Sequence, residues 1–342
     1  MTKLSLGMAL QPGPWGGGNQ FGYSLVEYLR CKGVEVYFDL KEPDLDLIVL
    51  TDPRTNLKSS AYSDKDIARY LLRKNWQAIV VHRINECDER KGTTGVNHRL
   101  MRANGCADHT VFISSWLRDL FLGHGLAMPE YSVILNGANP EVFNAKEYRR
   151  WDGSGKVRLV THHWGGGYLK GFDIYERLDR MLSEAPWHEK IEFTFIGNMP
   201  AGIHFTNAHY FPPQSGTELA ASIRSHHIYL TASQNEPAGM HHIEGAMCGL
   251  PLLYRESGAL PEYCRGFGIS FTTDNFEQKL QEIVDTYDQW VDRMQGYPHT
   301  AERMCENYYR LFLELLDCRE AIVKRRKWQR NPLWLARTLR PW

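Results

Sequence analysis

The segment Ile228-Tyr-Leu-Thr-Ala-Ser233, followed by Gln-Asn-Glu236-Pro-Ala-Gly239-Met-His-His-Ile-Glu244, is the most informative stretch of the chain. Its first six residues favour β structure and predict a strand, whereas the pattern over Met240–Cys248 predicts a helix. In a parallel sheet such a junction lies at the carboxyl edge, where the first free amides of the helix point toward a ligand. Gly239 allows close backbone approach to that ligand.

The same alternation of strand and helix patterns extends in both directions from this junction. One series runs from Leu4–Leu10 to Tyr131–Asn136, and a second runs from Val157–His163 to Ile269–Phe271. Between them, Ala145–Lys156 is charged, contains glycine and lacks periodicity, as expected of a linker. The pattern predicts an α/β protein with two Rossmann-like parallel-sheet domains. The expected divisions are residues 1–144, a linker at 145–156, residues 157–318 and a helical tail at 319–342.

Composition excludes several classes of protein. The chain has 342 residues, of which 43% are hydrophobic and 23% charged, which suits two globular domains with a cleft between them. With 40 basic and 40 acidic residues the formal net charge is zero, so we expect no nucleic-acid partner. The seven cysteines include no Cys-x-x-Cys pair, which argues against a zinc ribbon or a disulfide framework. Without a cleavage site or a long apolar run, the sequence predicts a cytoplasmic protein.

Two carboxylates flank the strand-to-helix junction. Glu236 lies in the loop and Glu244 lies one turn into the predicted helix, eight positions later. Paired carboxylates that accept hydrogen bonds from hydroxyl groups are what recognition of a ribose or a hexose requires. The alternative interpretation is that Glu236 caps the helix and Glu244 is a solvated helical residue.

The order of residues around this pair resembles glycosyltransferase family 4. The shared features are the two glutamates, the glycine between them, the run Glu244-Gly-Ala-Met-Cys-Gly-Leu-Pro251 and the later Gly258-Ala-Leu-Pro-Glu262. The resemblance implies a GT-B fold and retention of anomeric configuration without an essential metal or other cofactor. It also implies that the first glutamate and the backbone after it hold the donor sugar, and that the second glutamate binds the ribose of a nucleotide-sugar donor. Those roles fall on Glu236, Gly239, Met240 and Glu244, whereas Pro237-Ala238 departs from the commonest pattern and leaves the sugar open.

An upstream segment, His162-His163-Trp-Gly-Gly-Gly-Tyr-Leu-Lys170-Gly-Phe-Asp173, is similar to a second family motif. In the family an arginine and a lysine there clamp the donor diphosphate. Lys170 matches the lysine, and its place at a predicted helix start suits charge stabilisation on a leaving phosphate. The arginine is missing, and either His162 or His163 stands near its place. The alternative is that Lys170 is a surface lysine at a helix start.

Two features of the first series complete the expected site. Gly16 and Gly17 follow the first strand, and the resemblance implies that their loop faces the donor phosphate and the acceptor; the alternative is a tight turn. His82 ends the predicted strand Gln77–His82, so we expect it to point into the crevice at the sheet edge. The resemblance implies that this histidine contacts the donor sugar, and the alternative is a satisfied, partly buried histidine.

The loop after that strand contains Asp88 and Glu89, which could suggest a metal site or an acid/base pair. We expect a loop for acceptor contacts instead, because Arg83, Arg90 and Lys91 can neutralise the two carboxylates. Further on, Asn136-Gly137 suits a turn with positive φ and matches a family motif whose role we expect to be structural.

The C-terminal stretch from Lys324 to Trp342 has seven cations and no acid. Such a segment can lie on an anionic membrane surface, which would make the protein peripheral. The alternative, implied by the resemblance, is a helix that packs back on the first domain with its charges solvated. The sequence also predicts a kink at Pro332.

Taken together, these features predict a retaining glycosyltransferase that moves a sugar from a nucleotide-diphosphate sugar to a hydroxyl of a carbohydrate or lipid-linked acceptor. The residues expected to act in the reaction are Lys170, His82 and Glu236, with no metal ligands. The rivals are a nucleotide-sugar epimerase or a phosphorylase of the same architecture, and a non-catalytic subunit that binds a sugar nucleotide. The missing arginine favours the last of these.

Overall fold

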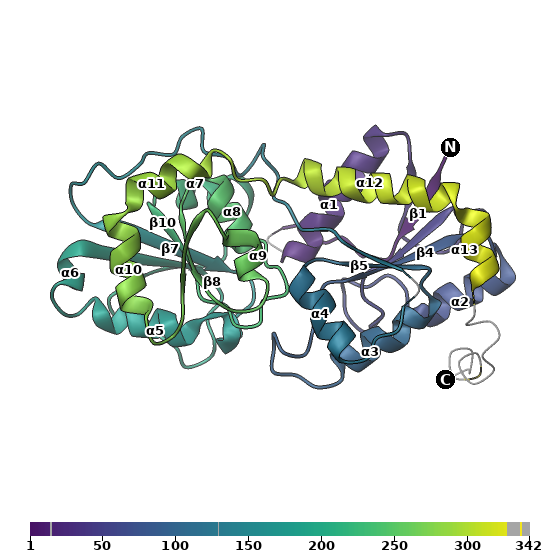
Figure 1. Ribbon diagram of the computed structural model, residues 1–342, viewed down its shortest axis with the longest axis horizontal. Helices are drawn as coiled ribbons and strands as arrows, with labels where there is room; N and C mark the ends of the chain where they lie inside the picture. The colour runs from purple at the N-terminus through teal and green to yellow at the C-terminus, as the bar shows by residue number, and fades with distance from the viewer. Residues whose placement is uncertain (14–15, 129, 327–335, 337–342) are drawn as a thin grey trace.

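The computed structural model describes residues 1–13, 16–128, 130–326 and 336, and it contains two six-stranded parallel sheets, each covered by helices. Figure 1 shows the two sheets in separate lobes, with the chain passing from one lobe to the other. The α/β class and the two parallel-sheet domains predicted from the sequence are confirmed.

The first sheet has the strand order β2-β1-β3-β4-β5-β6. The strands are β1 (Lys3–Leu6), β2 (Glu35–Tyr37), β3 (Leu47–Leu50), β4 (Ile79–Ile84), β5 (His109–Phe112) and β6 (Tyr131–Val133). Every residue of β3, β4 and β5 is buried, because helices cover both faces of the sheet. These helices are α1 (Gly17–Cys31), α2 (Asp64–Arg73), α3 (Val96–Ala103) and α4 (Ser115–Gly123), with a 3₁₀ turn η1 at Asn104–Cys106.

The second sheet has the order β12-β11-β10-β7-β8-β9. Its strands are β7 (Val157–His163), β8 (Ile191–Gly197), β9 (His209–Phe211), β10 (Ile228–Thr231), β11 (Leu252–Arg255) and β12 (Gly268–Phe271). Strand order reverses at β7 and β10, and in such sheets ligands bind beyond the carboxyl ends at this point. The helices are α5 (Phe172–Met181), α6 (Trp187–Lys190), α7 (Gly216–Arg224), α8 (His241–Met247), α9 (Leu260–Cys264), α10 (Phe276–Asp285) and α11 (Tyr287–Met294), and a 3₁₀ turn η2 at Tyr168–Lys170 precedes α5.

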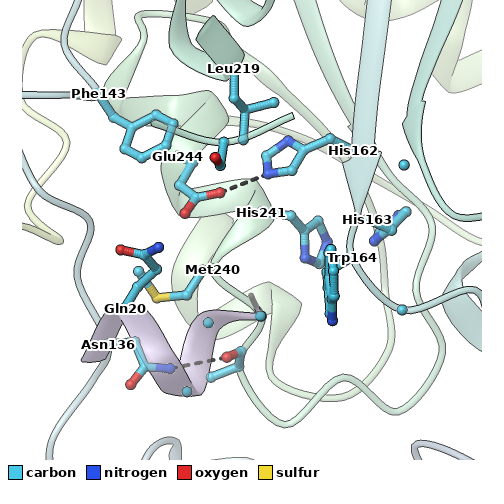
Figure 2. Close-up of a pocket in the computed structure, with 18 of the residues that line it drawn as sticks. Gln20, Asn136, Phe143, His162, His163, Trp164, Leu219, Met240, His241 and Glu244 are labelled. Atoms are coloured by element: carbon cyan, nitrogen blue, oxygen red, sulfur yellow. Dashed lines mark hydrogen bonds and ion pairs between the residues drawn. The ribbon is translucent and has the colours of Figure 1, made fainter. Parts of the chain in front are cut away.

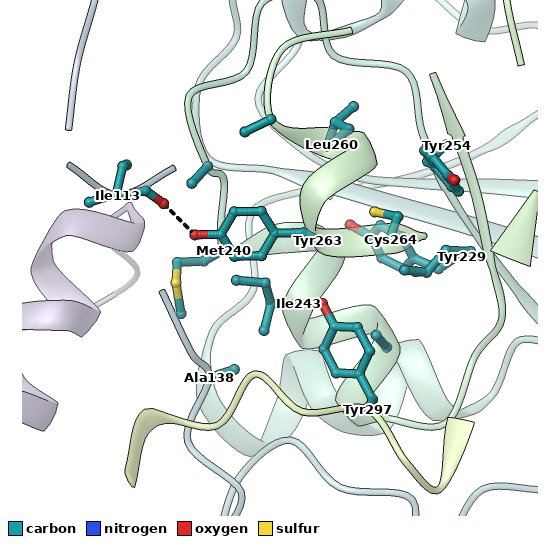
Figure 3. Packing of buried hydrophobic residues seen from close by; sticks show 14 of the residues in the cluster. Ile113, Ala138, Tyr229, Met240, Ile243, Tyr254, Leu260, Tyr263, Cys264 and Tyr297 are labelled. Carbon is teal, nitrogen blue, oxygen red and sulfur yellow. Dashed lines mark hydrogen bonds between the residues drawn. The ribbon is translucent and has the colours of Figure 1, made fainter. Parts of the chain in front are cut away.

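The two domains are joined by a continuous apolar core as well as by the chain. One buried cluster contains Phe112 and Leu117 of the first domain together with Ile243 and Leu260 of the second. Within it, the Tyr263 hydroxyl donates to the Ile113 carbonyl at 2.6 Å, as Figure 3 shows. Packing of this kind places the two carboxyl edges in a defined position relative to each other.

The chain returns to the first domain at a tight crossing. Gly137 lies so close to Thr300 that a Cβ at position 137 would be 2.1 Å from the Thr300 carbonyl oxygen. From there α12 (Ala301–Asp317) lies along α1, as Figure 1 shows, and α13 (Arg319–Arg325) follows. The return thus begins at Ala301, before residue 319 where the sequence placed it, because the apolar face of α12 completes the core of the first domain with Tyr308 and Phe312.

The end of the described chain is fastened to the first sheet. Arg326 donates from Nε and Nη2 to both oxygens of Asp108, at 2.7 and 2.6 Å, and both side chains are almost fully buried. Lys324, Arg325 and Arg326 are the only residues of the basic stretch within 1–326; the kink at Pro332 and the other cations lie outside the described residues. Within the described chain, no helix is long and apolar enough to cross a membrane.

We expect Arg326→Ala to lower the free energy of unfolding by about 3–5 kcal/mol, because it leaves the Asp108 carboxylate buried without its partner. The matched control is Arg325→Ala, which removes a half-exposed pair with Glu130 and should cost less than about 1 kcal/mol. Urea unfolding followed by circular dichroism measures both variants. Equal effects of the two substitutions would contradict this account of the fastening.

Candidate active site

A cleft of about 400 Å³ lies between the carboxyl edges of the two sheets. All the residues predicted to bind a donor line it, namely Gly16, Gly17, His162, His163, Lys170, Glu236, Gly239, Met240 and Glu244. They come from the start of α1, from β7 and the turn after it, from the loop between β10 and α8, and from α8 itself. The fold thus gathers at one place residues from both domains.

Glu236 is an almost fully buried charged group of the cleft, with a side chain only 2% exposed. Lys170 donates to its Oε2, and Nε of Arg90 lies 3.5 Å from its Oε1. Lys170 comes from η2 in the same domain, whereas Arg90 comes from the segment after β4 in the other domain. Each oxygen of the carboxylate therefore faces a different cation.

The charges in this network shift one another's pKa values. Burial alone would raise the pKa of Glu236, but Lys170 and Arg90 outweigh burial and lower the pKa to about 2. Burial lowers the pKa of Lys170, and the nearby Arg90 lowers it further, while Glu236 acts in the opposite direction. Glu236 is consequently a carboxylate at neutral pH that can accept hydrogen bonds but cannot act as an acid.

Glu244 belongs to a second hydrogen-bonded chain that starts on β10. The Tyr229 hydroxyl lies 2.9 Å from Nδ1 of His162 and accepts from the His162 backbone N–H. The hydroxyl hydrogen of Tyr229 therefore points to Nδ1 of His162, which accepts it. In this tautomer Nε2 carries the ring hydrogen and donates to Oε2 of Glu244 at 2.7 Å. Figure 2 shows His162 and Glu244 facing each other at the cleft. This chain orients Glu244 and leaves its Oε1 for a ligand.

More histidines form a layer beneath the cleft. Nε2 of His163 lies 2.8 Å from the Tyr175 hydroxyl, and Nε2 of His241 lies 2.7 Å from Oγ1 of Thr231. The rings of His163 and His241 have centroids 4.5 Å apart. Burial, followed by the charge of Lys170 for His163 and the neighbouring His163 for His241, holds the pKa of both well below the usual value. These rings are neutral supports for the site.

The glycine-rich loop meets the second domain across the cleft. A Cβ on Gly17 would lie 2.3 Å from Cγ of Met240, and a Cβ on Gly16 would lie 3.4 Å from Cδ1 of Trp164. Helix α1 begins at Gly17 with no side-chain cap and no acidic residue in its first turn. Its free amides and positive dipole end are thus directed to the region that an anionic ligand would occupy.

The geometry at Gly258 explains why the motif Gly258-Ala-Leu-Pro-Glu262 begins with a glycine. Its φ is +60°, and a Cβ there would lie 2.4 Å from the backbone nitrogen of Glu236. The Ala259 amide beside it donates to the Glu236 carbonyl at 2.8 Å, which supports the loop from below. Glu262 reaches the other domain, where it accepts from the Ser115 amide at 2.8 Å. The motif therefore positions the Glu236 loop.

His82 does not face the cleft, so this part of the predicted site is wrong. Its strand continues to Ile84, and in the register of the sheet His82 lies beside Thr110. Both side chains point to the 3₁₀ turn η1 and bond there to Oδ1 of Asn104, at 2.8 Å for His82. Burial lowers the pKa of His82 to about 4, despite the hydrogen bond that its ring donates to Oδ1 of Asn104. It is a neutral core histidine.

The loop after β4 also differs from the expectation. Asp88 caps α3, accepting from the amides of Val96 and Asn97 at 3.0 and 2.9 Å, and Glu89 accepts from the Asn97 side chain. Arg83 is buried under α1 and does not neutralise them, and Arg90 and Lys91 pair with Glu86 instead. The two acids are thus satisfied by local amides.

Three residues that matter here were not singled out from the sequence. The approach of Arg90 to Glu236 depends on how the domains dock. In the sequence Arg90 stands among other charged residues, so nothing marks it as a site residue. In the sequence Tyr229 has the pattern of an ordinary buried strand residue, and Trp164 belongs to a glycine-rich insertion. Among the described residues, no group of three or more His, Cys, Asp or Glu side chains is placed to hold a metal ion.

Solved structures of similar fold cover nearly the whole chain. The catalytic domain of starch synthase IV from Arabidopsis thaliana, bound to ADP and acarbose, covers 92% of this chain and 99% of its own, with a TM-score of 0.66 and 12% identity. Sucrose-phosphate synthase from Thermosynechococcus elongatus covers 93% and 100%, with a TM-score of 0.63 and 14% identity. HepE of Anabaena, in complex with UDP and glucose, covers 92% and 100%, with a TM-score of 0.63 and 13% identity. The chain has a GT-B fold.

The GT-B fold predicted from the glutamate motif is thereby confirmed for this chain. No family model matches the sequence, and no curated protein matches it by sequence. The likeness lies in the GT-B architecture, two facing parallel-sheet domains with a cleft between their carboxyl edges, and it extends from end to end of the solved chains named above.

The lowered pKa of Glu236 predicts a pH dependence of stability. A carboxyl group whose pKa falls from 4.5 to about 2 on folding stabilises the folded state above pH 4.5, and this contribution is lost as the pH falls toward 2. The stability of the wild type should therefore decline, relative to that of Glu236→Gln, by about 2 kcal/mol between pH 7 and pH 3. Urea unfolding of both proteins across this range measures the difference, and a constant difference would contradict the assignment.

Proposed function

We propose that this chain is a nucleotide-sugar-dependent glycosyltransferase. The observation that carries the proposal is that Glu236 and Glu244 line one cleft with Lys170, each held by its own hydrogen-bonded network. Two preorganised carboxylates and a cation suit a ligand with hydroxyl groups on both sides of an anionic centre. A nucleotide-diphosphate sugar has that arrangement, with hydroxyls on its sugar and on its ribose.

In this proposal the second domain, which begins at Val157 and ends before the return at Ala301, binds the donor. Glu236, with the backbone at Gly239 and Met240, holds the sugar, and the free Oε1 of Glu244 accepts from the ribose hydroxyls. Phe143 and Leu219 also line the cleft and offer an apolar surface to the base. The diphosphate lies near Lys170 and the first amides of α1, where positive charge and helix dipole favour it.

The first domain contributes the acceptor side of the cleft. The acceptor is a hydroxyl compound, a carbohydrate or a lipid-linked glycan. Reaction proceeds on the front face of the sugar: the bond from the anomeric carbon to the diphosphate oxygen breaks, and a bond to the acceptor oxygen forms on the same side. The acceptor proton passes to the departing phosphate oxygen, so configuration is retained. Lys170 stabilises the negative charge that grows on the diphosphate.

A second candidate, a subunit that binds the donor without transferring its sugar, is favoured by one observation. The segment around Lys170 has histidines where the resemblance places an arginine: His162 is paired with Glu244, and burial keeps the pKa of His163 well below its usual value. Consumption of donor across an acceptor panel separates the two functions. An epimerase would instead convert the donor without any acceptor, and a phosphorylase would require inorganic phosphate.

Lys170→Ala should lower kcat about 10²- to 10³-fold, because the charge that compensates the departing diphosphate is lost. The measurement is release of nucleoside diphosphate from a panel of UDP- and ADP-sugars, with water or an added glycan as acceptor. Lys190→Ala, an exposed lysine at the end of α6, serves as the matched control and should leave turnover unchanged. Turnover of Lys170→Ala at the wild-type rate would exclude the proposed role.

Glu244→Gln should weaken binding of a nucleoside diphosphate about 10-fold, because one charge-assisted hydrogen bond to the ribose is replaced by a neutral one. The loss should vanish for the 2′,3′-dideoxy analogue of the same nucleotide, which lacks the hydroxyls that Glu244 is proposed to bind. Isothermal titration calorimetry on both proteins with both ligands measures the four affinities that are compared. An equal loss for the two ligands would mean that Glu244 acts only through the His162 network.

A further inference from the structure

Arg90 is the one side chain of the first domain that faces the buried Glu236 carboxylate as a charged partner among the described residues. Its Nη1 lies 3.1 Å from Oε2 of Glu86, and its Nε lies 3.5 Å from Oε1 of Glu236. The side chain is 25% exposed and lines the cleft. In the described part of the chain its Nη2 group makes no hydrogen bond, so two donors of the guanidinium remain for a ligand.

Lys170 by itself leaves the proposed diphosphate poorly compensated. Its positive charge is already matched by Glu236, with which it forms an ion pair. His162 is already paired with Glu244 at 2.7 Å, so its ring is not available to a diphosphate. Burial keeps the pKa of His163 well below its usual value, so that ring adds no charge.

The charge balance around Glu236 therefore depends on Arg90. Glu86 pairs with both Arg90 and Lys91, at 3.1 and 2.8 Å. Arg90, Lys91 and Lys170 thus surround two carboxylates, Glu86 and Glu236, which leaves a surplus of one positive charge at this wall of the cleft. A surplus of positive charge in a partly enclosed cleft attracts an anion, because the protein walls screen the interaction less than bulk water does.

We propose that Arg90 binds the diphosphate of the donor from the first domain, opposite Lys170, and that its guanidinium compensates the leaving group. This inference rests on the proposed function and deepens it. An arginine suits the task because its planar group can face Glu236 with Nε, bind Glu86 with Nη1 and still offer the N–H groups of Nη2 to phosphate oxygens. The donor is then held by cations of both domains, so departure of the diphosphate depends on their being docked.

The test is a comparison of nucleotides with nucleosides. Arg90→Gln keeps a polar side chain and removes its charge, and Arg90→Lys restores a charge without the planar guanidinium. UDP, ADP, uridine and adenosine are titrated into each protein by calorimetry, with displacement titrations for weak ligands. We expect Arg90→Gln to weaken the binding of UDP or ADP about 10- to 100-fold and to leave the matching nucleoside within about 3-fold. Arg90→Lys should recover part of the loss.

Lys41→Ala is the control, since it removes a cation of the first domain that is 88% exposed and does not line the cleft, and it should change the affinity for UDP or ADP less than about 3-fold. Wild-type affinity of Arg90→Gln for the diphosphates would overturn the inference. An equal loss of nucleoside and diphosphate would overturn it too, because Arg90 would then act only in docking the domains. If the wild type binds neither UDP nor ADP, the proposed function itself fails, and that result is visible before any variant is compared.

Discussion

The ion pair between Lys170 and Glu236 is the interaction on which the rest of the site depends. Both groups are buried, and a buried charge is tolerated only when partners and hydrogen bonds surround it. The surrounding structure is arranged accordingly: Gly258 supports the loop backbone, Arg90 takes the second oxygen, and neutral histidines fill the space beneath. Glu236 is thereby kept ionised and in place for a ligand.

This arrangement requires that the two domains be docked as they are. The apolar cluster around Tyr263 runs through both domains, and α12 ties the end of the second domain to the helices of the first. The contact of Arg90 with Glu236 exists only because of that docking. In a cleft of this kind, relative movement of the domains changes the charge around the ligand as well as the volume available to it.

Much of the fold and part of the site could be predicted because local sequence patterns specify them. Strands such as β3 and β7 are buried apolar runs, and the junction before α8 shows a strand, a glycine and a helix in order. His82 was misplaced because its strand extends two residues further, and a side chain in mid-strand follows the face that register assigns to it. The role of Asp88 was missed because capping depends on where α3 begins.

The sequence by itself determined the two parallel-sheet domains, because periodicity needs no knowledge of distant residues, and its resemblance to a known family implied the grouping of Glu236, Glu244 and Lys170. Only the tertiary structure decided which charges meet. Arg90 and Glu236 lie far apart along the chain, as do His162 and Glu244. In neither pair does the sequence around one residue indicate that the other is its partner. Electrostatic contacts of this kind depend on angstrom-scale distances that packing sets, so no local signal can specify them.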